Sequence, residues 1–341
     1  MKPASATADT RLDEAGLRNL LADALGASVE EIVPVARLQL KRNVERMALE
    51  VRGRSQSIIV KSVPPEIARR NRLVVERWLP AAGLAEAAPE VLGILTRPDP
   101  ARVWLVCADV GTHTLRTTDR APEQVAAAVA LIARLHRSFA DHALLGEVRL
   151  WGGDLGMAFH TGNLRDALRA VEALAPLAAG SAARSALRER LLARLRELLR
   201  DAPRRAAVME RRGGPETLLH GDLWLENLVE DPRTEYGLRL IDWDHAGVGP
   251  ALYDVSTFLF RFAPEERRAL WELYRRELGA DVWDLPEESE LNLLCETAEH
   301  ARFANHLIWP ALAALRGDDE MGFEELSAVE SWFDDLRPAL P

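Results

Sequence analysis

The stretch that decides the fold is Leu218–Asp244, which reads LLHGDLWLENLVEDPRTEYGLRLIDWD. Asp222 is followed five positions later by Asn227, and a second aspartate, Asp242, follows an apolar run that is typical of a strand. This is the order of a site built from a general base, an amide that binds a metal ion and a carboxylate that binds a metal ion. The pattern therefore predicts phosphoryl transfer.

The three residue types suit that chemistry. A phosphoryl group passes to a hydroxyl through a loose transition state, so the protein mainly positions groups and neutralises charge. A carboxylate beside the acceptor hydroxyl orients it and takes its proton, which we predict for Asp222. Mg²⁺ prefers carboxylate and amide oxygens, so Asn227 and Asp242 are the predicted metal ligands.

The same stretch predicts a β-hairpin. One strand begins at Leu228, a turn starts at Asp231-Pro232, and Leu238–Ile241 returns alongside. Folding back in this way would carry the second aspartate to the side of Asn227 and Asp222. The alternative is an acidic hairpin whose aspartates only cap turns.

A family resemblance rests on these residues. His220-Gly221-Asp222, Asn227 and Ile241–Asp244 together resemble the aminoglycoside phosphotransferase and choline kinase family, whose hallmark is HGDxxxxN followed by IDWD or IDFE. The continuation Gly249–Val255 is also similar to that family. The resemblance implies that Asp222 is the catalytic base and that Asn227 and Asp242 hold Mg²⁺.

Two further aspartates take roles from the same resemblance. Asp254 is implied to be a buried residue that fixes the catalytic loop. Asp244 is implied to assist a second metal ion or to bind substrate.

The resemblance also implies a protein-kinase-like fold of the α+β class with two lobes. Residues 1–108 would form a small nucleotide-binding lobe around a mixed antiparallel sheet, and residues 109–341 a large, mostly helical catalytic and substrate-binding lobe. The apolar pattern predicts strands at 32–40, 44–51, 57–63, 91–95 and 103–106. It predicts helices at 11–25, 65–79, 122–136, 185–199, 264–278, 287–313 and 323–336.

Lys61 ends a strand-like run and is predicted to contact the nucleotide phosphates, as a kinase requires. The alternative is a lysine at the solvated end of a strand. Its usual glutamate partner is not evident, because Asn71-Arg72 stands where the family's helix pattern places the glutamate. We take Glu76 as the expected partner, with a plain surface glutamate as the alternative.

Two backbone segments are expected near the nucleotide. The loop around Asn43 contains no glycine, and Asn43 either contacts phosphate or only joins two strands. Residues 107–110 resemble the family's hinge, and the expected adenine contacts come from the backbone of Cys107, Ala108, Asp109 and Val110. A linker without contacts is the alternative there. The expected nucleotide is ATP, with GTP as the other candidate.

Composition bounds the class of protein. With 48% hydrophobic and 28% charged residues in 341, the chain resembles an ordinary globular protein. No apolar run approaches a membrane span, and the first residues lack the core of a signal peptide, so we expect a cytoplasmic protein without membrane partners. Two cysteines form no disulfide framework. The net charge of −10 argues against a nucleic-acid partner and suits a cationic substrate.

The acceptor is expected to be a small molecule that carries a hydroxyl group. Trp224, Asp244 and Glu299 are its predicted contacts, and Trp309 is expected to lie in the core. Antibiotic inactivation competes with metabolic phosphorylation of choline, amino alcohols, sugars or homoserine, and the sequence does not select among them. A pseudokinase that binds nucleotide without turnover remains a further alternative.

Overall fold

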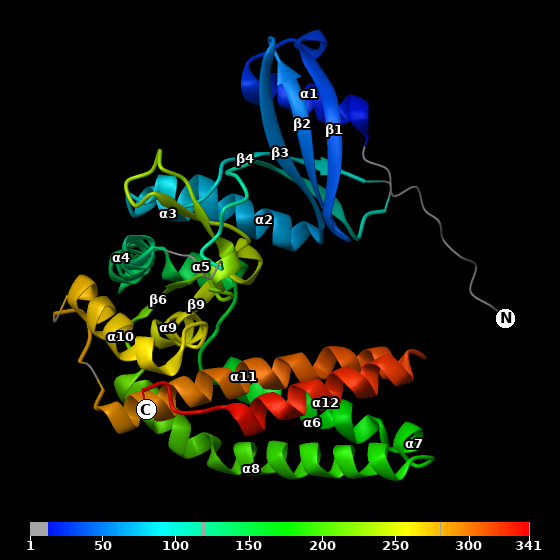
Figure 1. Cartoon of the computed structure of the whole chain (residues 1–341), viewed down its shortest axis with the longest axis vertical. Coiled ribbons are helices and arrows are strands. Elements are labelled where there is room, and N and C mark those ends of the chain that lie inside the picture. The colour runs from blue at the N-terminus through cyan, green and yellow to red at the C-terminus, as the bar shows by residue number, and fades with distance from the viewer. Residues whose placement is uncertain (1–12, 98, 117–120, 280, 285, 341) are drawn as a thin grey trace. The chain divides into compact units, whose positions relative to one another are not determined.

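The computed structural model describes residues 13–97, 99–116, 121–279, 281–284 and 286–340 (Figure 1). The chain divides into two compact units. The first unit comprises the chain up to Ala128 together with Glu226–Ala246, and the second comprises Val129–Leu225 and the chain from Gly247 onward. The segment that carries Asn227 and Asp242 is therefore part of the unit built around the N-terminal strands.

An antiparallel sheet forms the first unit, with strands in the order β1-β2-β3-β5-β4. Its strands are β1 (Ile32–Lys41), β2 (Val44–Val51), β3 (Arg54–Val63), β4 (Val91–Thr96) and β5 (Val103–Ala108). Arg52 and Gly53 both adopt positive φ in the tight turn between β2 and β3. The register places Lys61 of β3 between Val44 of β2 and Leu105 of β5.

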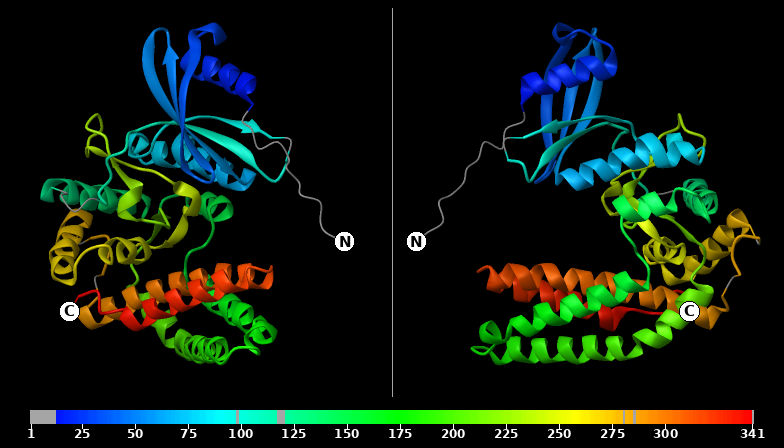
Figure 2. Two further views of the ribbon diagram at one scale, coloured as in Figure 1. Left: turned by 45° about the vertical axis from the view of Figure 1, so that its right-hand side comes forward. Right: turned by 180° about the vertical axis from the view of Figure 1, so that it is seen from behind.

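Helices cover opposite faces of this sheet. Helix α1 (Glu14–Leu25) lies against one face of the sheet (Figure 2). Its Leu17 and Leu21 pack in one cluster with Ile58 and Val60 of β3. Helix α2 (Pro65–Leu73) packs on the face that carries Val63 and Leu105. Because side chains alternate along a strand, Lys61 lies on the α2 face. The chain stays helical after α2 through the π-helical turn η2 (Val74–Trp78) and α3 (Leu79–Ala81).

The N-terminal helix begins with a cap. The carboxylate of Asp13 accepts hydrogen bonds from the backbone N–H groups of Ala15 and Gly16, both at 3.1 Å. The expected start of this helix at Arg11 lies outside the described residues. Short 3₁₀ turns, η1 (Val29–Glu31) and η3 (Ala85–Ala87), complete the N-terminal part of the unit.

The predicted hairpin is confirmed. Strands β7 (Leu228–Glu230) and β8 (Leu238–Leu240) pair antiparallel, with Leu228 opposite Leu240. The 3₁₀ turn η4 (Leu225–Asn227) precedes the hairpin, and η5 (Trp243–His245) follows it. Leu228 of β7 and Leu238 and Leu240 of β8 are buried, so the hairpin is packed into the first unit.

The second unit is mostly helical. A small antiparallel pair, β6 (Glu216–Leu219) and β9 (Gly247–Pro250), flanks the HGD motif and the continuation of the chain after IDWD. The helices are α4 (Pro122–Phe139), within which the division between the units falls, α5 (Leu145–Trp151), α6 (Met157–Ala173), α7 (Ala175–Ala178), α8 (Ala182–Arg212), α9 (Leu252–Leu259), α10 (Pro264–Leu278), α11 (Glu288–Leu315) and α12 (Asp319–Asp335).

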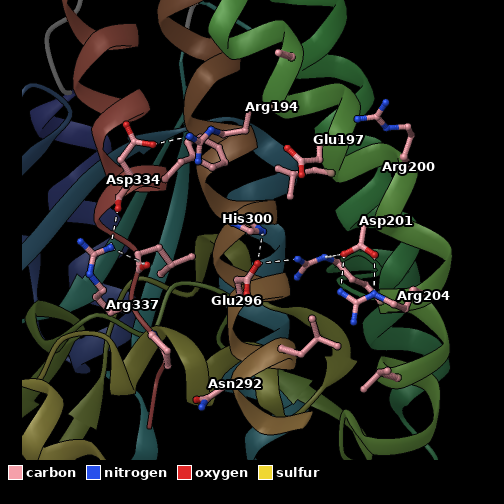
Figure 3. Close-up of a pocket in the computed structure, with 18 of the residues that line it drawn as sticks. Arg194, Glu197, Arg200, Asp201, Arg204, Asn292, Glu296, His300, Asp334 and Arg337 are labelled. Atoms are coloured by element: carbon pink, nitrogen blue, oxygen red, sulfur yellow. Dashed lines mark hydrogen bonds and ion pairs between the residues drawn. The ribbon is translucent and has the colours of Figure 1, made fainter. Parts of the chain in front are cut away.

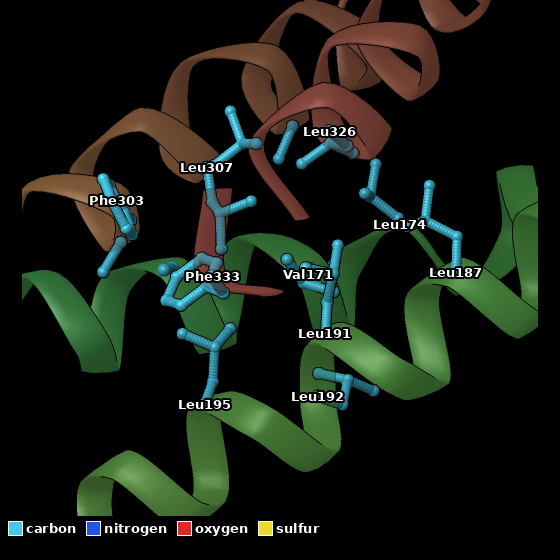
Figure 4. Close-up of a cluster of buried hydrophobic side chains, with 14 of the residues drawn as sticks. Val171, Leu174, Leu187, Leu191, Leu192, Leu195, Phe303, Leu307, Leu326 and Phe333 are labelled. Atoms are coloured by element: carbon cyan, nitrogen blue, oxygen red, sulfur yellow. The ribbon is translucent and has the colours of Figure 1, made fainter. Parts of the chain in front are cut away.

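Helices α6, α7, α8, α11 and α12 share one apolar core. Leu191 and Leu195 of α8 meet Leu307 of α11 and Phe333 of α12, and Val171 of α6 closes the cluster (Figure 4). The expectation that Trp309 lies in the core is wrong, because 64% of its side chain is exposed. Leu307 and the next core position, one helical turn further on, face inward, so the residue midway between them faces outward.

Truncation within this core gives a test of the packing. Leu307→Ala removes a fully buried side chain and should lower the free energy of unfolding by about 2–5 kcal/mol through lost burial and the cavity left behind. Leu315→Ala is the matched control on the same helix, since its side chain is 42% exposed, and should change stability by about 0.5 kcal/mol or less. Urea unfolding followed by circular dichroism measures both, and equal losses would contradict the described packing.

Candidate active site

The loop that carries the predicted base is held by a buried carboxylate. In the second unit, Asp254 of α9 accepts hydrogen bonds from the backbone N–H of His220 at 2.6 Å and of Gly221 at 2.9 Å. Gly221 has φ of +79°, a left-handed conformation that glycine adopts without strain. Asp222 follows directly and is half-buried. The implied role of Asp254, a buried residue that fixes this loop, is confirmed.

His136 and the backbone of His220 contact the Asp254 carboxylate and favour its ionised form. Nε2 of His136 lies 3.5 Å from its carboxylate, and Nδ1 of the same ring lies 2.8 Å from the Tyr274 hydroxyl. Burial alone would raise the pKa of Asp254, but hydrogen bonding and charge from His136, the charge of His220 and the backbone N–H of His220 together hold that pKa below its ordinary value.

The predicted metal ligands lie together in the first unit. The backbone carbonyl of Asn227 accepts a hydrogen bond from the N–H of Ile241 at 2.9 Å, so Asp242 follows immediately beside it. Asp242 has φ of +66°, a left-handed conformation that costs about 1–2 kcal/mol for a residue with a Cβ atom. Such local strain persists where the surrounding structure holds it, and it is frequent at functional sites.

The donor set suits Mg²⁺. A carboxylate and an amide supply the hard oxygens that this ion prefers, and Mg²⁺ commonly binds one or two carboxylates together with substrate phosphates. No group of three His, Cys, Asp or Glu side chains capable of holding a metal ion occurs in the part of the chain that the structure describes.

Lys61 joins this cluster from the sheet. Its Nζ lies 2.5 Å from Oδ1 of Asp242 and 2.7 Å from Oδ2 of Asp244. Burial alone would lower the pKa of Lys61, but the two adjacent carboxylates outweigh it and raise that pKa above its ordinary value. The ammonium group therefore stays charged, and it separates two aspartates that would otherwise repel each other.

The expectation that Glu76 pairs with Lys61 is wrong. Glu76 is exposed and accepts a hydrogen bond from Nε of Arg72 at 2.8 Å, one helical turn away. The residue of α2 that reaches the cluster is Asn71, whose Nδ2 donates to Oδ1 of Asp244 at 3.0 Å. The sequence contained the signal, because Asn71 occupies the position where the family pattern places a glutamate.

Asp244 lies inside this network. Its two carboxylate oxygens bind Lys61 and Asn71, and its backbone carbonyl accepts a hydrogen bond from Arg70. Sequence analysis did not anticipate Arg70 or Asn71 as members of the site. The network ties the IDWD segment to helix α2, whereas a contact between Asp244 and the acceptor stays a prediction.

The predicted nucleotide contacts lie in the same unit. Nδ2 of Asn43 donates to the carbonyl of Ser62 at 3.3 Å and so fixes the β1–β2 turn to β3. The Asp109 carboxylate binds Nε of Arg46 at 2.6 Å and the Ser57 hydroxyl at 2.7 Å. Burial raises the pKa of the Cys107 thiol to about 12, so this sulfur is neutral. Adenine contacts from the backbone of Cys107, Ala108, Asp109 and Val110 stay a prediction.

A pocket with a volume of about 570 Å³ in the second unit contains two of the predicted acceptor contacts, Trp224 and Glu299. The guanidinium of Arg261 lies 4.0 Å from the Trp224 ring centroid. Glu299 is 1% exposed, is bonded by Arg302 and lies 3.7 Å from Arg261. Its carboxylate is thus already neutralised by protein cations.

A larger groove with a volume of about 1460 Å³ lies along α8, α11 and α12 (Figure 3). Its charged side chains bind each other: the pairs are Arg190–Glu330, Arg194–Asp334, Arg204–Asp201 and Arg205–Glu296. None of the predicted site residues lines it. The acceptor contacts predicted at Trp224 and Glu299 therefore belong to the smaller pocket, which we call the acceptor pocket.

The fold and these residues are those expected of a protein-kinase-like phosphotransferase. The chain belongs to the phosphotransferase enzyme family (APH), whose family model matches residues 31–291. No curated protein sequence matches the chain. None of the helices that the structure describes has the length and apolar character needed to cross a membrane.

Solved structures confirm the kinase-like fold. A spectinomycin phosphotransferase in complex with ADP and spectinomycin is 12% identical, with a TM-score of 0.58 and 95% of each chain covered. A choline kinase from Cryptosporidium parvum Iowa II is 11% identical, with a TM-score of 0.57 and 93% of each chain covered. An aminoglycoside phosphotransferase from Streptomyces rimosus, in complex with ADP and streptomycin, is 18% identical, with a TM-score of 0.51 over 85% of this chain and 99% of that one.

Asp254 provides a test of how the loop is held. Asp254→Asn should lower the free energy of unfolding at neutral pH by about 2 kcal/mol or more, because hydrogen bonds to a charged acceptor are lost in a buried site. The folded-state pKa is depressed, so the stabilisation is complete above the ordinary value of 3.8 and is lost as pH falls through the lower folded value.

Urea unfolding at a series of pH values measures this effect. The gap between wild type and Asp254→Asn should shrink as pH falls below 3.8. Asp166→Asn, at an exposed site on α6, is the control and should change stability by about 0.5 kcal/mol or less. A gap that stays constant with pH would contradict the role given to the Asp254 carboxylate.

Proposed function

We propose that the protein transfers the γ-phosphoryl group of ATP to a hydroxyl group of a small molecule, with Mg²⁺ as the metal ion. The observation that carries the proposal is the Lys61–Asp242 pair beside Asn227, joined in sequence to the loop that Asp254 holds. Asp222 and Asn227 are five residues apart, so at most about 18 Å of extended chain separates them. Membership of the phosphotransferase family supports the same chemistry.

Asp222 would act as the general base. It follows a pinned pair of backbone N–H groups, so its position is fixed before the acceptor binds. As a carboxylate it would accept a hydrogen bond from the acceptor hydroxyl, orient that oxygen and take its proton during transfer.

The phosphates of the nucleotide and their metal ion would be bound by Asn227, Asp242 and Lys61. Asn227 and Asp242 would bind Mg²⁺. When bound, this ion would neutralise negative charge on the phosphates. An ammonium group has three N–H donors. Two of those on Lys61 point to Asp242 and Asp244, which leaves the third to bind a phosphate oxygen.

The base of the nucleotide would bind along Cys107–Val110, where β5 ends and the chain leaves the sheet. Two of the structural neighbours were solved with ADP, which supports an adenine nucleotide over GTP. The role in the cell, antibiotic inactivation or metabolism, follows from the acceptor and is a separate question from the chemistry.

Removal of the base tests the reaction. Asp222→Ala should lower kcat by about 10²–10⁴-fold, the usual contribution of a general base, while the Kd for ATP stays within about two-fold of the wild-type value. ADP release with a panel of hydroxyl-bearing acceptors measures turnover, and calorimetry measures nucleotide binding. Unchanged turnover of the variant would overturn the assignment. If the wild-type protein binds nucleotide but transfers phosphate to no acceptor of the panel, the result would favour a pseudokinase.

A second set of variants tests the phosphate-binding network. Lys61→Met should raise the Kd for MgATP about ten-fold or more, since it removes a charged donor and leaves two aspartates in mutual repulsion. Asn71→Ala should raise it by a smaller factor because it releases Asp244. Glu76→Ala is the control on the same helical segment and should have no effect. A large effect of Glu76→Ala would restore it as the partner of Lys61.

A further inference from the structure

The acceptor pocket begins beside the proposed base. Trp224 lines the pocket, and its backbone N–H donates to the carbonyl of Asp222 at 2.9 Å. The pocket volume of about 570 Å³ is in the range typical of sites for small molecules. Every residue of its wall belongs to the second unit, so its chemistry can be evaluated within that unit alone.

The wall carries an excess of positive charge. Four arginines line it against two carboxylates, and the buried one of the two, Glu299, is held by arginines of the same wall. The arginines are Arg261, Arg267, Arg302 and Arg337, and the second carboxylate belongs to Asp335, at the exposed end of α12. This local excess stands in a chain whose net charge is −10.

Within the described ranges, two of these arginines direct hydrogen bonds to backbone carbonyls. Arg267 donates to the carbonyls of Phe262 at 3.0 Å and Pro338 at 3.4 Å. Arg337 donates to the carbonyls of Asp334 at 2.7 Å and Leu336 at 3.3 Å. Carbonyl oxygens orient a guanidinium group but do not cancel its charge, so the pocket retains a positive potential.

Aromatic rings supply the rest of the wall, namely Trp224, Phe260, Phe303 and Trp332. Arg261 stacks on Trp224, and Arg267 lies 4.7 Å from the ring centroid of Phe260. A stacked guanidinium directs its N–H groups outward in its own plane, the geometry that binds carboxylate or phosphate oxygens. The wall therefore combines an apolar surface with donors for an anion.

Resting on the proposed function, we infer that the acceptor is a hydroxyl-bearing anion: a carboxylate or phosphate monoester on an apolar body. The anionic group binds at the arginines, the apolar body packs on the aromatic rings, and the hydroxyl reaches Asp222. A cationic acceptor would lose its hydration against a positive wall whose buried carboxylate is already paired. This departs from the cationic substrate that the net charge of the whole chain suggests.

A matched series of acceptors tests the inference. We choose a straight-chain hydroxy carboxylate, its methyl ester, the amino alcohol of the same chain length and the corresponding hydroxyalkyl phosphate, each at several chain lengths. Calorimetry on the full chain gives the Kd of each compound, and ADP release gives its turnover. The carboxylate or the phosphate should bind about ten-fold or more tightly than the ester, and the amino alcohol most weakly.

Variants locate the anion. Arg337→Gln, at an exposed position, and Arg261→Gln should each weaken binding of the anion about ten-fold and leave binding of the ester within about two-fold. Arg276→Gln, on α10 but outside the pocket wall, removes the same charge and should change neither. Equal or tighter binding of the amino alcohol overturns the inference, as does anion binding that neither pocket variant weakens.

The two proposals fail in different ways. If the amino alcohol is phosphorylated and the anions are not, the phosphotransferase function stands and the anionic acceptor is wrong. If the anions bind in an Arg337-dependent manner and no compound of the series is phosphorylated, the pocket has the stated preference and the proposed transfer to this acceptor class is wrong. Comparison of the carboxylate with the phosphate then identifies which anion the arginines prefer.

Discussion

The hydrogen bonds between the Asp254 carboxylate and the backbone of His220 and Gly221 are the constraint on which the proposed chemistry depends. These bonds hold the backbone of the glycine-containing turn that immediately precedes Asp222. Every residue of α9 is buried, so the helix that supplies Asp254 cannot shift without disturbing the core around it. A buried charge is costly unless it is paired, and the nearby histidines and the two N–H groups meet that cost here.

A second constraint acts in the first unit, where the register of β3 and the hairpin β7–β8 bring one lysine to two aspartates. Each aspartate lowers the cost of burying Lys61, and Lys61 suppresses the repulsion between them. The strained backbone of Asp242 is held by this arrangement. The charged groups that we propose for binding a phosphate and a metal ion are therefore held in position by one another.

Local patterns predicted the elements of this structure well. Strand β2 and helix α10 have the bounds that periodicity indicated, and Pro264 at the first helical position explains the latter. The hairpin followed from a turn signal between two apolar runs. The predictions that failed concerned contacts between side chains that lie far apart in the sequence. Glu76 was the expected lysine partner although it lies off the position that the family pattern gives the glutamate. It is exposed and bonds Arg72, and Asn71 reaches the cluster instead.

The charge of the acceptor pocket could not be predicted from sequence for a related reason. Its arginines come from the segment after α9, from α10, from α11 and from the chain after α12, and no spacing along the chain relates them. Net charge is a sum over the whole surface, and charges more than about 10 Å apart are largely screened at moderate ionic strength. A ligand in a pocket responds to the groups that line it, so an acidic chain can present a basic site. The apolar rings strengthen this effect, because they displace water and lower the local dielectric constant around the guanidinium groups.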